Sequence, residues 1–435
     1  MRSISVCDGS RIMFSFERDK NDEDRCGKLK FDMCQDPIFV ELNGYCSPND
    51  IHPDLIGVAA ILLCNPFVGE SLELPLPVSE GFIQKIRPII SKYRIEAQID
   101  SDLSSLEIEE GLRPALAFSG GADSSAALAV MPRNTIPIFL NRPLREGTQY
   151  NSEAPLAVCQ RLRECGYDTI VIDSDLEYIR DPVGFPTDLA HSIPAILLSR
   201  SIGINSISFG TVMESGYGIG HEHFVDYKNR AHWRFFNALF DSVGIELSLP
   251  TLGISEVGTA IICNSSPIAA LGQSCIRGSW GGPCLRCWKC FRKELLNYSL
   301  GYSEYSDFLG IIDAVEVQVR LSAYPISHEN VIIYSLQNIE LDTHPYLKPI
   351  AEKIDMDLNL TLLERWYSSS IDFVPSRHRF RIRENILSFL EPMTPSQERL
   401  LESWDMGPHL ETKKAREAQE KLASFWQDLT TRFVE

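Results

Sequence analysis

The sequence predicts an α/β fold in which a Rossmann-like parallel sheet carries helices on both faces. Three observations support this: five short apolar runs alternate with helical patterns, a glycine- and serine-rich turn follows the first run, and four clustered cysteines follow the last. Alternating strands and helices are typical of parallel sheets, because parallel strands need a long crossover connection. We divide the chain into an α+β N-terminal domain of unknown role at 1–112, the α/β domain at 113–298 and a mainly helical C-terminal region at 299–435.

The α/β domain is expected to contain five strands and four connecting helices. The expected strands are the apolar runs Ala115–Phe118, Thr135–Leu140, Thr169–Asp173, Ser206–Phe209 and Ile245–Leu249. The expected helices fill the intervals, at Ala122–Met131, Ser152–Cys165, Asp188–Ile202 and Asn229–Val243. Ligands of such folds bind at the carboxyl ends of the strands. We therefore expect a ligand at the turn that follows Phe118.

The flanking regions carry weaker patterns. In the N-terminal domain, Pro37–Leu42 reads as a strand, and Ser79 is a candidate cap of a helix that Pro88 would interrupt. Near the C-terminus, apolar residues at helical spacing form one face: Ala415, Ala418, Leu422, Phe425, Leu429 and Phe433. This face has two possible roles: it packs against the rest of the protein, or it binds a partner or a second copy of the chain.

Composition and charge limit the classes of function. The chain has 435 residues, of which 44% are hydrophobic and 23% charged, which is typical of a globular protein. Its net charge of -18 argues against a large nucleic-acid surface, which needs clustered Lys and Arg. The N-terminal segment lacks the apolar run of a secretory signal, and the longest apolar run, Leu55–Cys64, is too short to span a membrane. We expect a cytoplasmic protein with reduced cysteines and no membrane contact.

The turn after the first strand has the composition of an anion site. It reads Ser-Gly-Gly-Ala-Asp-Ser-Ser over residues 119–125. Glycines let the backbone approach a ligand closely, while the amides and the positive dipole end of the following helix attract negative oxygens. The turn lacks the Gly-Lys-Ser/Thr ending of kinase-type P-loops and the three spaced glycines of the dinucleotide fingerprint. A capped helix without a ligand is the structural alternative.

Four of the twelve cysteines form a cluster. They are Cys275, Cys284, Cys287 and Cys290, with two-residue gaps between the last three. Such gaps let neighbouring thiolates converge on one ion, and structural zinc favours a closed shell of four sulfurs. We expect zinc, and leave an iron–sulfur cluster or unligated thiols as alternatives.

The segment Ser-Gly-Gly-x-Asp-Ser at a strand-to-helix turn resembles the signature of the PP-loop ATP pyrophosphatases, which have a HUP-type sheet and cleave ATP between its α and β phosphates. The resemblance implies ATP and Mg²⁺ as cofactors, with the loop holding pyrophosphate and Asp123 helping to place Mg²⁺. It assigns the nucleotide pocket to Phe118, Ser119, Gly120, Gly121, Asp123, Ser124, Ser125 and Gly210. The catalytic candidates among them are Ser119, Asp123 and Ser124.

The loop and the cysteine spacing together resemble the 7-cyano-7-deazaguanine synthase family over residues 114–298. Gly210 and Ser215–Tyr217 look like the substrate-side loop of that family. Two departures concern the substrate contacts: Asn141–Pro143 replaces the usual Tyr-Gly-Gln, and Glu214 replaces an aspartate. With the greater chain length, they indicate a divergent branch, such as the synthase-like proteins of antiviral-defence or other specialised gene clusters.

The resemblance implies ATP-dependent adenylation of a carboxylate, with 7-carboxy-7-deazaguanine as the small-molecule substrate. An amine then gives an amide or a nitrile, and both ammonia and an amino group of a protein substrate are open as that amine. Two other functions stay open: a PP-loop enzyme that thiolates or aminates RNA, against which the acidic charge speaks, and a catalytically silent binding scaffold. Homo-oligomerisation is also open.

Other polar residues near the motifs remain without a fixed role. Lys289, Arg292 and Lys293 follow the cysteine cluster, and they are candidates for stabilising phosphate charge or, alternatively, a solvated helix face. The α/β domain also contains four histidines to which no role is assigned: His191, His221, His223 and His232.

Overall fold

The computed structural model describes the chain except for residues 23–31, 35–36, 147, 221–222, 407–416 and 418–435. The expected C-terminal apolar face and His221 therefore lie outside the described residues. Within the described ranges, no helix combines the length and the apolar character needed to cross a membrane.

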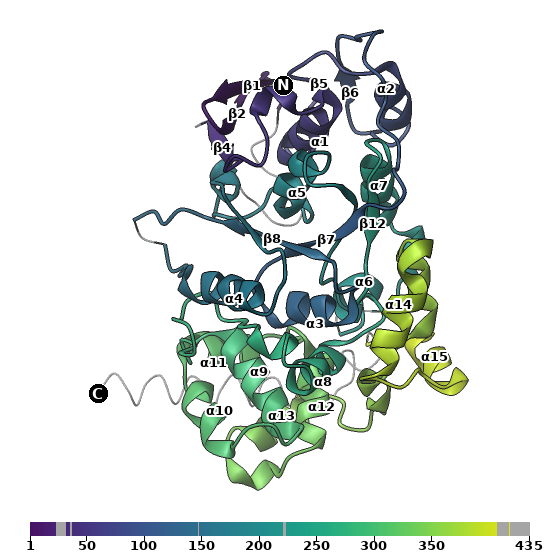
Figure 1. The fold of residues 1–435 in the computed structure, drawn as a ribbon. Coiled ribbons are helices and arrows are strands. Elements are labelled where there is room, and N and C mark those ends of the chain that lie inside the picture. The colour runs from purple at the N-terminus through teal and green to yellow at the C-terminus, as the bar shows by residue number, and fades with distance from the viewer. Residues whose placement is uncertain (23–31, 35–36, 147, 221–222, 407–416, 418–435) are drawn as a thin grey trace.

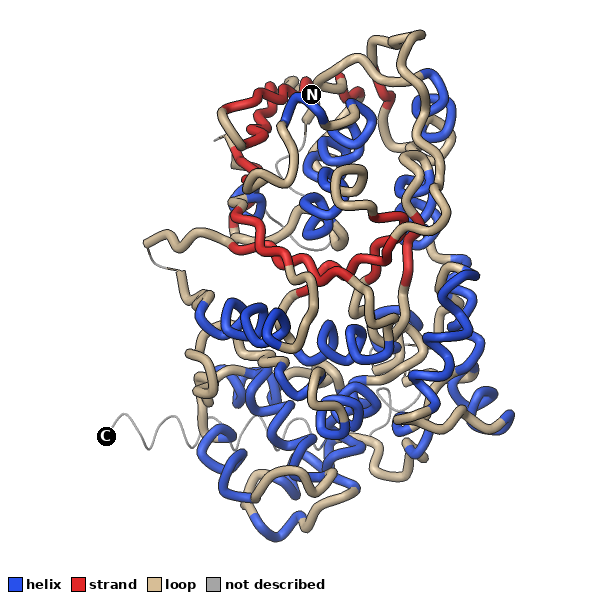
Figure 2. Tube along the Cα trace, in the orientation of Figure 1, coloured by secondary structure: helices blue, strands red, loops and turns tan. Residues whose placement is uncertain are grey.

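A five-stranded parallel sheet forms the centre of the molecule (Figures 1 and 2). In spatial order its strands are β12 (Glu246–Ser248), β11 (Ile204–Ser208), β7 (Arg113–Phe118), β8 (Ile136–Asn141) and β9 (Ile170–Asp173). Each neighbouring pair is parallel. These pairings confirm the expected parallel strands. The sheet is doubly wound, because successive strands are added in opposite directions on either side of the β7–β11 boundary.

Helices cover both faces of this sheet, as predicted. On one face lie α5 (Ile193–Leu198) and α7 (Ala231–Asp241), and on the other lie α3 (Ala122–Val130) and α4 (Glu153–Glu164) (Figure 1). The helix expected from Asp188 is shorter than predicted, because a 3₁₀ turn at residues 190–192 precedes α5, which has proline in its first turn. This turn leaves the preceding residues outside the regular helix.

The N-terminal region forms a second, mixed sheet above the first (Figure 1). Its strands in spatial order are β4 (Ile38–Glu41), β2 (Arg11–Glu17), β1 (Arg2–Asp8), β5 (Ser71–Glu73) and β6 (Arg94–Glu96). Helix α1 (Pro53–Cys64) is buried and packs against α5, so the region shares one apolar core with the central sheet. Helix α2 (Glu80–Ile86) is capped by Ser79 and ends before Pro88. A short strand, β3 (Asp32–Met33), pairs with β10 (Arg180–Asp181).

The described part of the C-terminal half consists of helices that pack beneath α3. They are α8 (Glu256–Ser265), α9 (Trp288–Ser299), α10 (Tyr305–Ile312), α11 (Val315–Ser322), α12 (Glu329–Gln337), α13 (Leu347–Lys353), α14 (Ser376–Leu387) and α15 (Pro395–Glu402). Helices α8 and α14 both contact α3, and α12 contacts α9. A further short helix, α6 (Met213–Tyr217), follows β11, and 3₁₀ turns connect several elements: 48–50, 176–179, 190–192, 227–229, 269–271, 341–343, 361–364 and 368–373.

Candidate functional site

The segment Ser119–Ser125, which we call the phosphate loop, joins β7 to α3. Gly120 has a φ of +74°, and a Cβ atom there would lie 2.8 Å from the Cβ of Pro155 in α4. Both the left-handed backbone and the contact with α4 require glycine at this position. Gly121 then caps α3 with an extended backbone, so the first amides of the helix face the turn.

Serine hydroxyls hold the phosphate loop in shape. The Ser119 amide donates to Ser124 Oγ at 3.3 Å, and Ser124 Oγ donates to the Gly121 carbonyl at 3.0 Å. The Ser119 and Ser124 hydroxyl oxygens are 3.0 Å apart. Ser125 Oγ is buried and has no hydrogen-bond partner among the described residues. The loop is therefore ordered by its own hydroxyls and keeps one buried donor unused.

Gly210, two residues after β11, lies directly against the phosphate loop. A Cβ atom at this position would lie 2.8 Å from the amide nitrogen of Ser124 and 2.9 Å from the carbonyl oxygen of Asp123. Any larger residue would push β11 away from the start of α3. The structure thus brings Gly210 and the loop together, although about ninety residues separate them in the sequence.

A cavity of about 460 Å³ opens at this point, at the carboxyl ends of β7 and β11. Ser119, Asp123 and Ser124 line one side of it. The other side, which we call the opposite wall, comprises Asp188, Leu189, His191, Phe209, Tyr227 and His232. The cavity lies where the strand order reverses, which is the usual position of a ligand in a doubly wound sheet, and its volume suits a small-molecule ligand.

Asp123 belongs to a charged cluster beneath the loop. Its Oδ1 accepts a hydrogen bond from Thr259 Oγ1 at 3.2 Å and lies 3.5 Å from Lys293 Nζ. Lys293 Nζ also lies 2.9 Å from Glu256 Oε1. Burial opposes the charge on Lys293, but the carboxylates of Asp123 and Glu256 raise its pKa above the ordinary value. Lys293 is therefore a buried cation held by two carboxylates.

Several side chains form hydrogen bonds or ion pairs with Glu256 at the start of α8. Arg292 Nε donates to its carboxylate at 2.9 Å, and His328 Nδ1 lies 3.6 Å away. Burial opposes ionisation, yet Lys293, Arg292 and His328 lower the pKa of Glu256. The alternative of a solvated helix face does not hold for Arg292 and Lys293, whose side chains are 8% and 14% exposed.

Glu214 forms a second buried carboxyl group next to this cluster. Both of its oxygens accept from the Glu256 amide, at 3.0 and 3.1 Å, and Asn330 Nδ2 donates to Oε1 at 3.0 Å. Burial, and then the charge of Glu256, raise the pKa of Glu214 to about 7. The extra reach of Glu compared with Asp thus serves to cap α8 and to contact α12.

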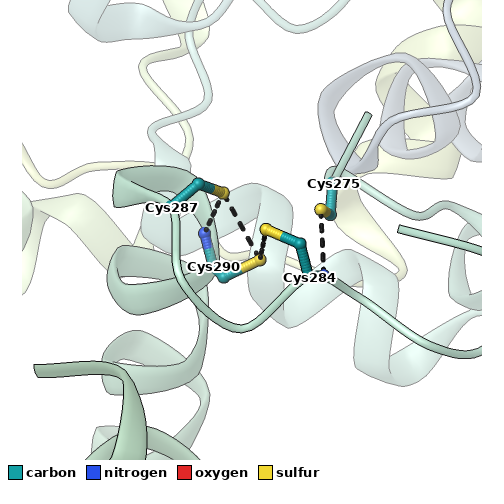
Figure 3. Close-up of side chains that lie close together, drawn as sticks. All are labelled: Cys275, Cys284, Cys287 and Cys290. Carbon is teal, nitrogen blue, oxygen red and sulfur yellow. Dashed lines mark hydrogen bonds between the residues drawn. The ribbon is translucent and has the colours of Figure 1, made fainter. Parts of the chain in front are cut away.

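The four clustered cysteines converge in space as well as in sequence (Figure 3). Their sulfur atoms all lie within 4.8 Å of one another. Cys290 Sγ is 3.8 Å from Cys284 Sγ and 3.5 Å from Cys287 Sγ. Four sulfurs at about 2.3 Å from a tetrahedral zinc ion would be about 3.8 Å apart. The group could therefore hold a metal ion, and its donors and spacing fit zinc.

The cysteine cluster and the phosphate loop are joined through the backbone. The Gln273 amide donates to the Gly120 carbonyl at 2.8 Å, and Ser274 Oγ accepts from the Ala122 amide at 3.2 Å. The next residue is Cys275. At the other end, Cys287 caps α9, and α9 carries Lys293 to Asp123. A metal bound by the cysteines would fix both connections.

Not every residue predicted for the nucleotide pocket faces the cavity. Phe118 is buried with α3 in the apolar core. Arg142 stacks over the Tyr150 ring at 4.3 Å and pairs with Glu177, away from the cavity lining. Lys289 lines a second cavity of about 240 Å³ between the loop and the cysteine cluster. His223 forms an isolated bridge with Asp405, so His191 and His232 are the described histidines that line the main cavity.

Several residues of the site carried no recognisable signal in the sequence. Glu256, Thr259 and Asn330 hold the charged cluster together, and Asp188 and Tyr227 belong to the opposite wall. None of them lies in a motif of fixed spacing, and they come from several elements: Glu256 and Thr259 from α8, Asn330 from α12, and Asp188 and Tyr227 from the segments before α5 and α7. Their proximity arises only when α8, α9 and α12 pack together beneath α3.

The fold and the site define an α/β protein with a glycine-serine loop at the end of a parallel strand and four cysteines that could bind a metal. In comparisons with known proteins, residues 235–405 match a family model described as a family of unknown function (DUF6395). The matched segment includes the four cysteines and α8 to α15 but not the phosphate loop. No curated protein and no solved structure matches the chain significantly.

Proposed function

We propose that the protein is an ATP-dependent adenylating enzyme of the PP-loop ATP pyrophosphatase type, with a HUP-type sheet. The observation that carries this proposal is the position of the phosphate loop, which ends the central strand β7 and exposes Ser119, Asp123 and Ser124 to the main cavity. Free amides at a helix start and serine hydroxyls suit the oxygens of pyrophosphate. A cavity of about 460 Å³ beside them leaves room for the remaining reactants.

The proposed reaction joins a carboxylate to AMP. A carboxylate oxygen of the acceptor bonds to the α phosphorus of ATP, the bond from that phosphorus to the bridging oxygen breaks, and pyrophosphate leaves. An amine then attacks the acyl carbon, loses a proton and displaces AMP, which leaves an amide. Where the amine is ammonia, adenylation of the amide oxygen by a second ATP, followed by loss of AMP and a proton, would give a nitrile. By the family resemblance, the acceptor is 7-carboxy-7-deazaguanine, and the amine is ammonia or an amino group of a protein.

The residues of the loop would act by fixed electrostatics. Asp123 is the residue that would hold Mg²⁺, an ion that neutralises phosphate charge when bound. Lys293 and Thr259 both bind the Oδ1 atom of Asp123, so the carboxylate is oriented before any ligand arrives. Groups that are already oriented need no reorganisation as charge develops on the departing pyrophosphate.

Zinc would have a structural role in this enzyme. Cys275, Cys284, Cys287 and Cys290 would hold it in a closed four-sulfur shell, which leaves no position for a substrate. The contacts of Gln273 and Ser274 with the loop backbone transmit that rigidity to Gly120 and Ala122. We also propose that the enzyme acts in the cytoplasm without nucleic acid, which agrees with its net charge of -18.

The test is release of AMP and pyrophosphate from ATP and Mg²⁺, with and without 7-carboxy-7-deazaguanine. We expect AMP that depends on the acceptor, and a decrease of about 10²- to 10³-fold in the Asp123→Ala variant. Asp168→Asn is the matched control, because Asp168 is an exposed carboxylate paired with Arg113 outside the cavity lining. Release of ADP, or no AMP from the wild type, would contradict the proposal.

The same samples separate the remaining possibilities. Copurified tRNA, with iron and visible absorbance in place of zinc, would indicate an RNA-modifying enzyme. Tight ATP binding without AMP formation from any carboxylate or RNA substrate would indicate a binding scaffold. One zinc per chain and no nucleic acid would agree with the proposed enzyme.

A further inference from the structure

The opposite wall contains a chain of polar groups that ends in a carboxylate. Tyr227 Oη lies 2.8 Å from His232 Nδ1, and His232 Nε2 lies 3.2 Å from Asp188 Oδ2. All three residues line the main cavity. Tyr227 is 2% exposed, whereas the Asp188 side chain is 81% exposed. The chain therefore runs from the protein interior to a carboxylate that is open to the cavity.

The direction of the hydrogen bonds follows from the chemistry of each group. Burial raises the pKa of Tyr227, so its hydroxyl stays protonated and donates to His232 Nδ1. The Nε2–H of His232 then donates to Asp188, and this hydrogen bond lowers the pKa of Asp188. Both ring nitrogens are used, so His232 offers no lone pair to a substrate. The group available for recognition is the ionised carboxylate of Asp188.

An uncharged surface lines the same cavity. Burial lowers the pKa of His191 to about 4, so its ring is neutral. The ring packs at an angle of 85° against Phe209, with centroids 5.1 Å apart, and Leu189 lines the cavity beside them. Such a surface suits a planar heterocycle. The guanidinium of Arg230, which also lines the cavity, is held by the Ser215 carbonyl at 3.0 Å.

The carboxylates at the two ends of the cavity have different partners. Asp123 at the phosphate loop is paired with the buried cation Lys293, whereas Asp188 is hydrogen-bonded to His232. The ionised Asp188 would repel the phosphates of ATP, whose oxygens find amide and hydroxyl donors at the phosphate loop. What faces Asp188 must therefore carry N–H or O–H donors. Two adjacent N–H donors on a ring pair well with the two oxygens of one carboxylate, and such charge-assisted bonds are stronger than neutral ones.

We propose that Asp188 determines specificity for the acceptor by binding a ring N–H and the neighbouring amino group of a 2-aminopyrimidin-4-one edge, while the heterocycle packs on His191, Phe209 and Leu189. This deepens the proposed function and rests on it for the identity of the acceptor. His232 and Tyr227 are positioning residues, because they orient the carboxylate and present no free acceptor of their own.

The test compares 7-carboxy-7-deazaguanine with its analogue in which hydrogen replaces the 2-amino group. A site built to bind an N–H group rejects analogues that lack it, so we expect the wild type to prefer the parent at least about 100-fold in kcat/KM. In Asp188→Asn we expect the preference to fall below about threefold, with the KM for ATP changed less than about twofold. Asp168→Asn is the control and should keep the wild-type preference. Thermal unfolding of each variant shows that the fold is retained.

The outcomes are distinguishable from those of the proposed function. An increased KM for ATP with the acceptor preference unchanged would place Asp188 against the ribose and overturn the inference. A loss of kcat alone, with a shifted pH profile, would make it a general base and also overturn it. If the wild type releases no AMP, calorimetric binding of the two acceptors still decides: loss of the preference in Asp188→Asn supports the inference, and equal or absent binding by the wild type refutes it.

Discussion

The phosphate loop and the opposite wall face the same cavity, but they hold their polar groups in different ways. The loop uses consecutive residues, with backbone amides and short hydroxyls that are packed against Pro155 and Gly210. The opposite wall uses side chains from three separate segments, and its terminal carboxylate is exposed. Backbone geometry therefore governs one end, and a chain of side-chain hydrogen bonds governs the other. Substitutions at the two ends should change different measurable quantities.

The two ends also differ in what supports them. The loop is supported by the cysteine cluster, through Gln273 and Ser274, and by Lys293 of α9. The opposite wall comes from the segment before α5, from Phe209 after β11, and from the turn before α7 and its first residues. Helices α5 and α7 lie on the other face of the sheet from α3 (Figure 1). A substitution in the C-terminal helices should therefore weaken ATP binding more than acceptor binding.

The largest effect is expected from loss of the proposed zinc ion. Cys290→Ser removes the sulfur that lies 3.5 Å from Cys287 Sγ and 3.8 Å from Cys284 Sγ. Structural zinc contributes strongly to folding free energy, so we expect zinc content to fall well below one per chain and the free energy of unfolding to fall by at least about 3 kcal/mol. Metal analysis and urea unfolding measure the two quantities.

Cys165→Ser, at an exposed cysteine, is the matched control and should leave both quantities unchanged. In the folded fraction of Cys290→Ser, ATP binding should weaken more than acceptor binding. Equal weakening of ATP binding and acceptor binding would contradict the inference that the cysteine cluster supports the phosphate loop and not the opposite wall. Full zinc content in the variant would show that the four cysteines do not form one closed site.

A substitution that strains the backbone of the phosphate loop should weaken both folding and ATP binding. Gly120→Ala combines a left-handed φ of +74° with a Cβ contact of 2.8 Å to Pro155. Strain and crowding together should cost about 2–4 kcal/mol and raise the Kd for ATP at least about tenfold. Gly111→Ala is the control, because Gly111 has a φ of +77° with no atom within 4 Å of the added Cβ. It should cost only about 1 kcal/mol. Equal losses in the two variants would show that the contact with α4 is unimportant.

The buried carboxyl of Glu214 should make stability depend on pH. Its pKa is raised to about 7 in the folded protein, from an ordinary value near 4.5. The folded state thus keeps a proton that the unfolded chain has lost, so this contribution is present below about pH 4.5 and is lost as the pH rises through 7. Because of this group, the free energy of unfolding of the wild type should decrease by about 1–3 kcal/mol between pH 5 and pH 8. The Glu214→Gln variant should lack this decrease.

Glu164→Gln, at an exposed pair with Arg161, should keep the wild-type dependence on pH. Comparing how steeply the free energy of unfolding changes with pH in each protein cancels any pH-independent cost of the introduced amide. A Glu214→Gln slope equal to that of the wild type would mean that Glu214 is ionised throughout. The substitution should barely change the acceptor preference, because Glu214 caps α8 and does not line the cavity.

The sequence predicted most of the central sheet, because each strand is a run of apolar residues. The phosphate loop was recognisable because its glycines and serines are consecutive in the chain. All five expected strands are present, within about two residues at each end. The cysteine cluster was also visible, since its ligands are close in the sequence. The charged cluster was not, because Asp123, Glu256 and Lys293 come from three helices that meet only through packing. The same holds for Asp188 and His232, which lie in separate segments.

The smallest expected effect tests whether the opposite wall acts as a connected chain. Tyr227→Phe removes the donor to His232 Nδ1 and leaves the aromatic ring in its contacts with Trp233 and Phe373. Without that donor, His232 can adopt the other tautomer and release Asp188. We expect the acceptor preference to fall about three- to tenfold, which corresponds to loss of one hydrogen bond, while the KM for ATP and the unfolding midpoint stay near the wild-type values.

Tyr178→Phe is the control for loss of a phenolic hydroxyl, since Tyr178 donates to the Pro143 carbonyl and does not line the cavity. It should leave the acceptor preference unchanged. If Tyr227→Phe lowers stability without changing the preference, the hydroxyl is only a packing element and Asp188 is oriented by other contacts. If it lowers the preference as far as Asp188→Asn does, the Asp188 carboxylate has no stable orientation without the hydrogen bonds from Tyr227 and His232. The opposite wall would then depend on side-chain hydrogen bonds even more than we infer.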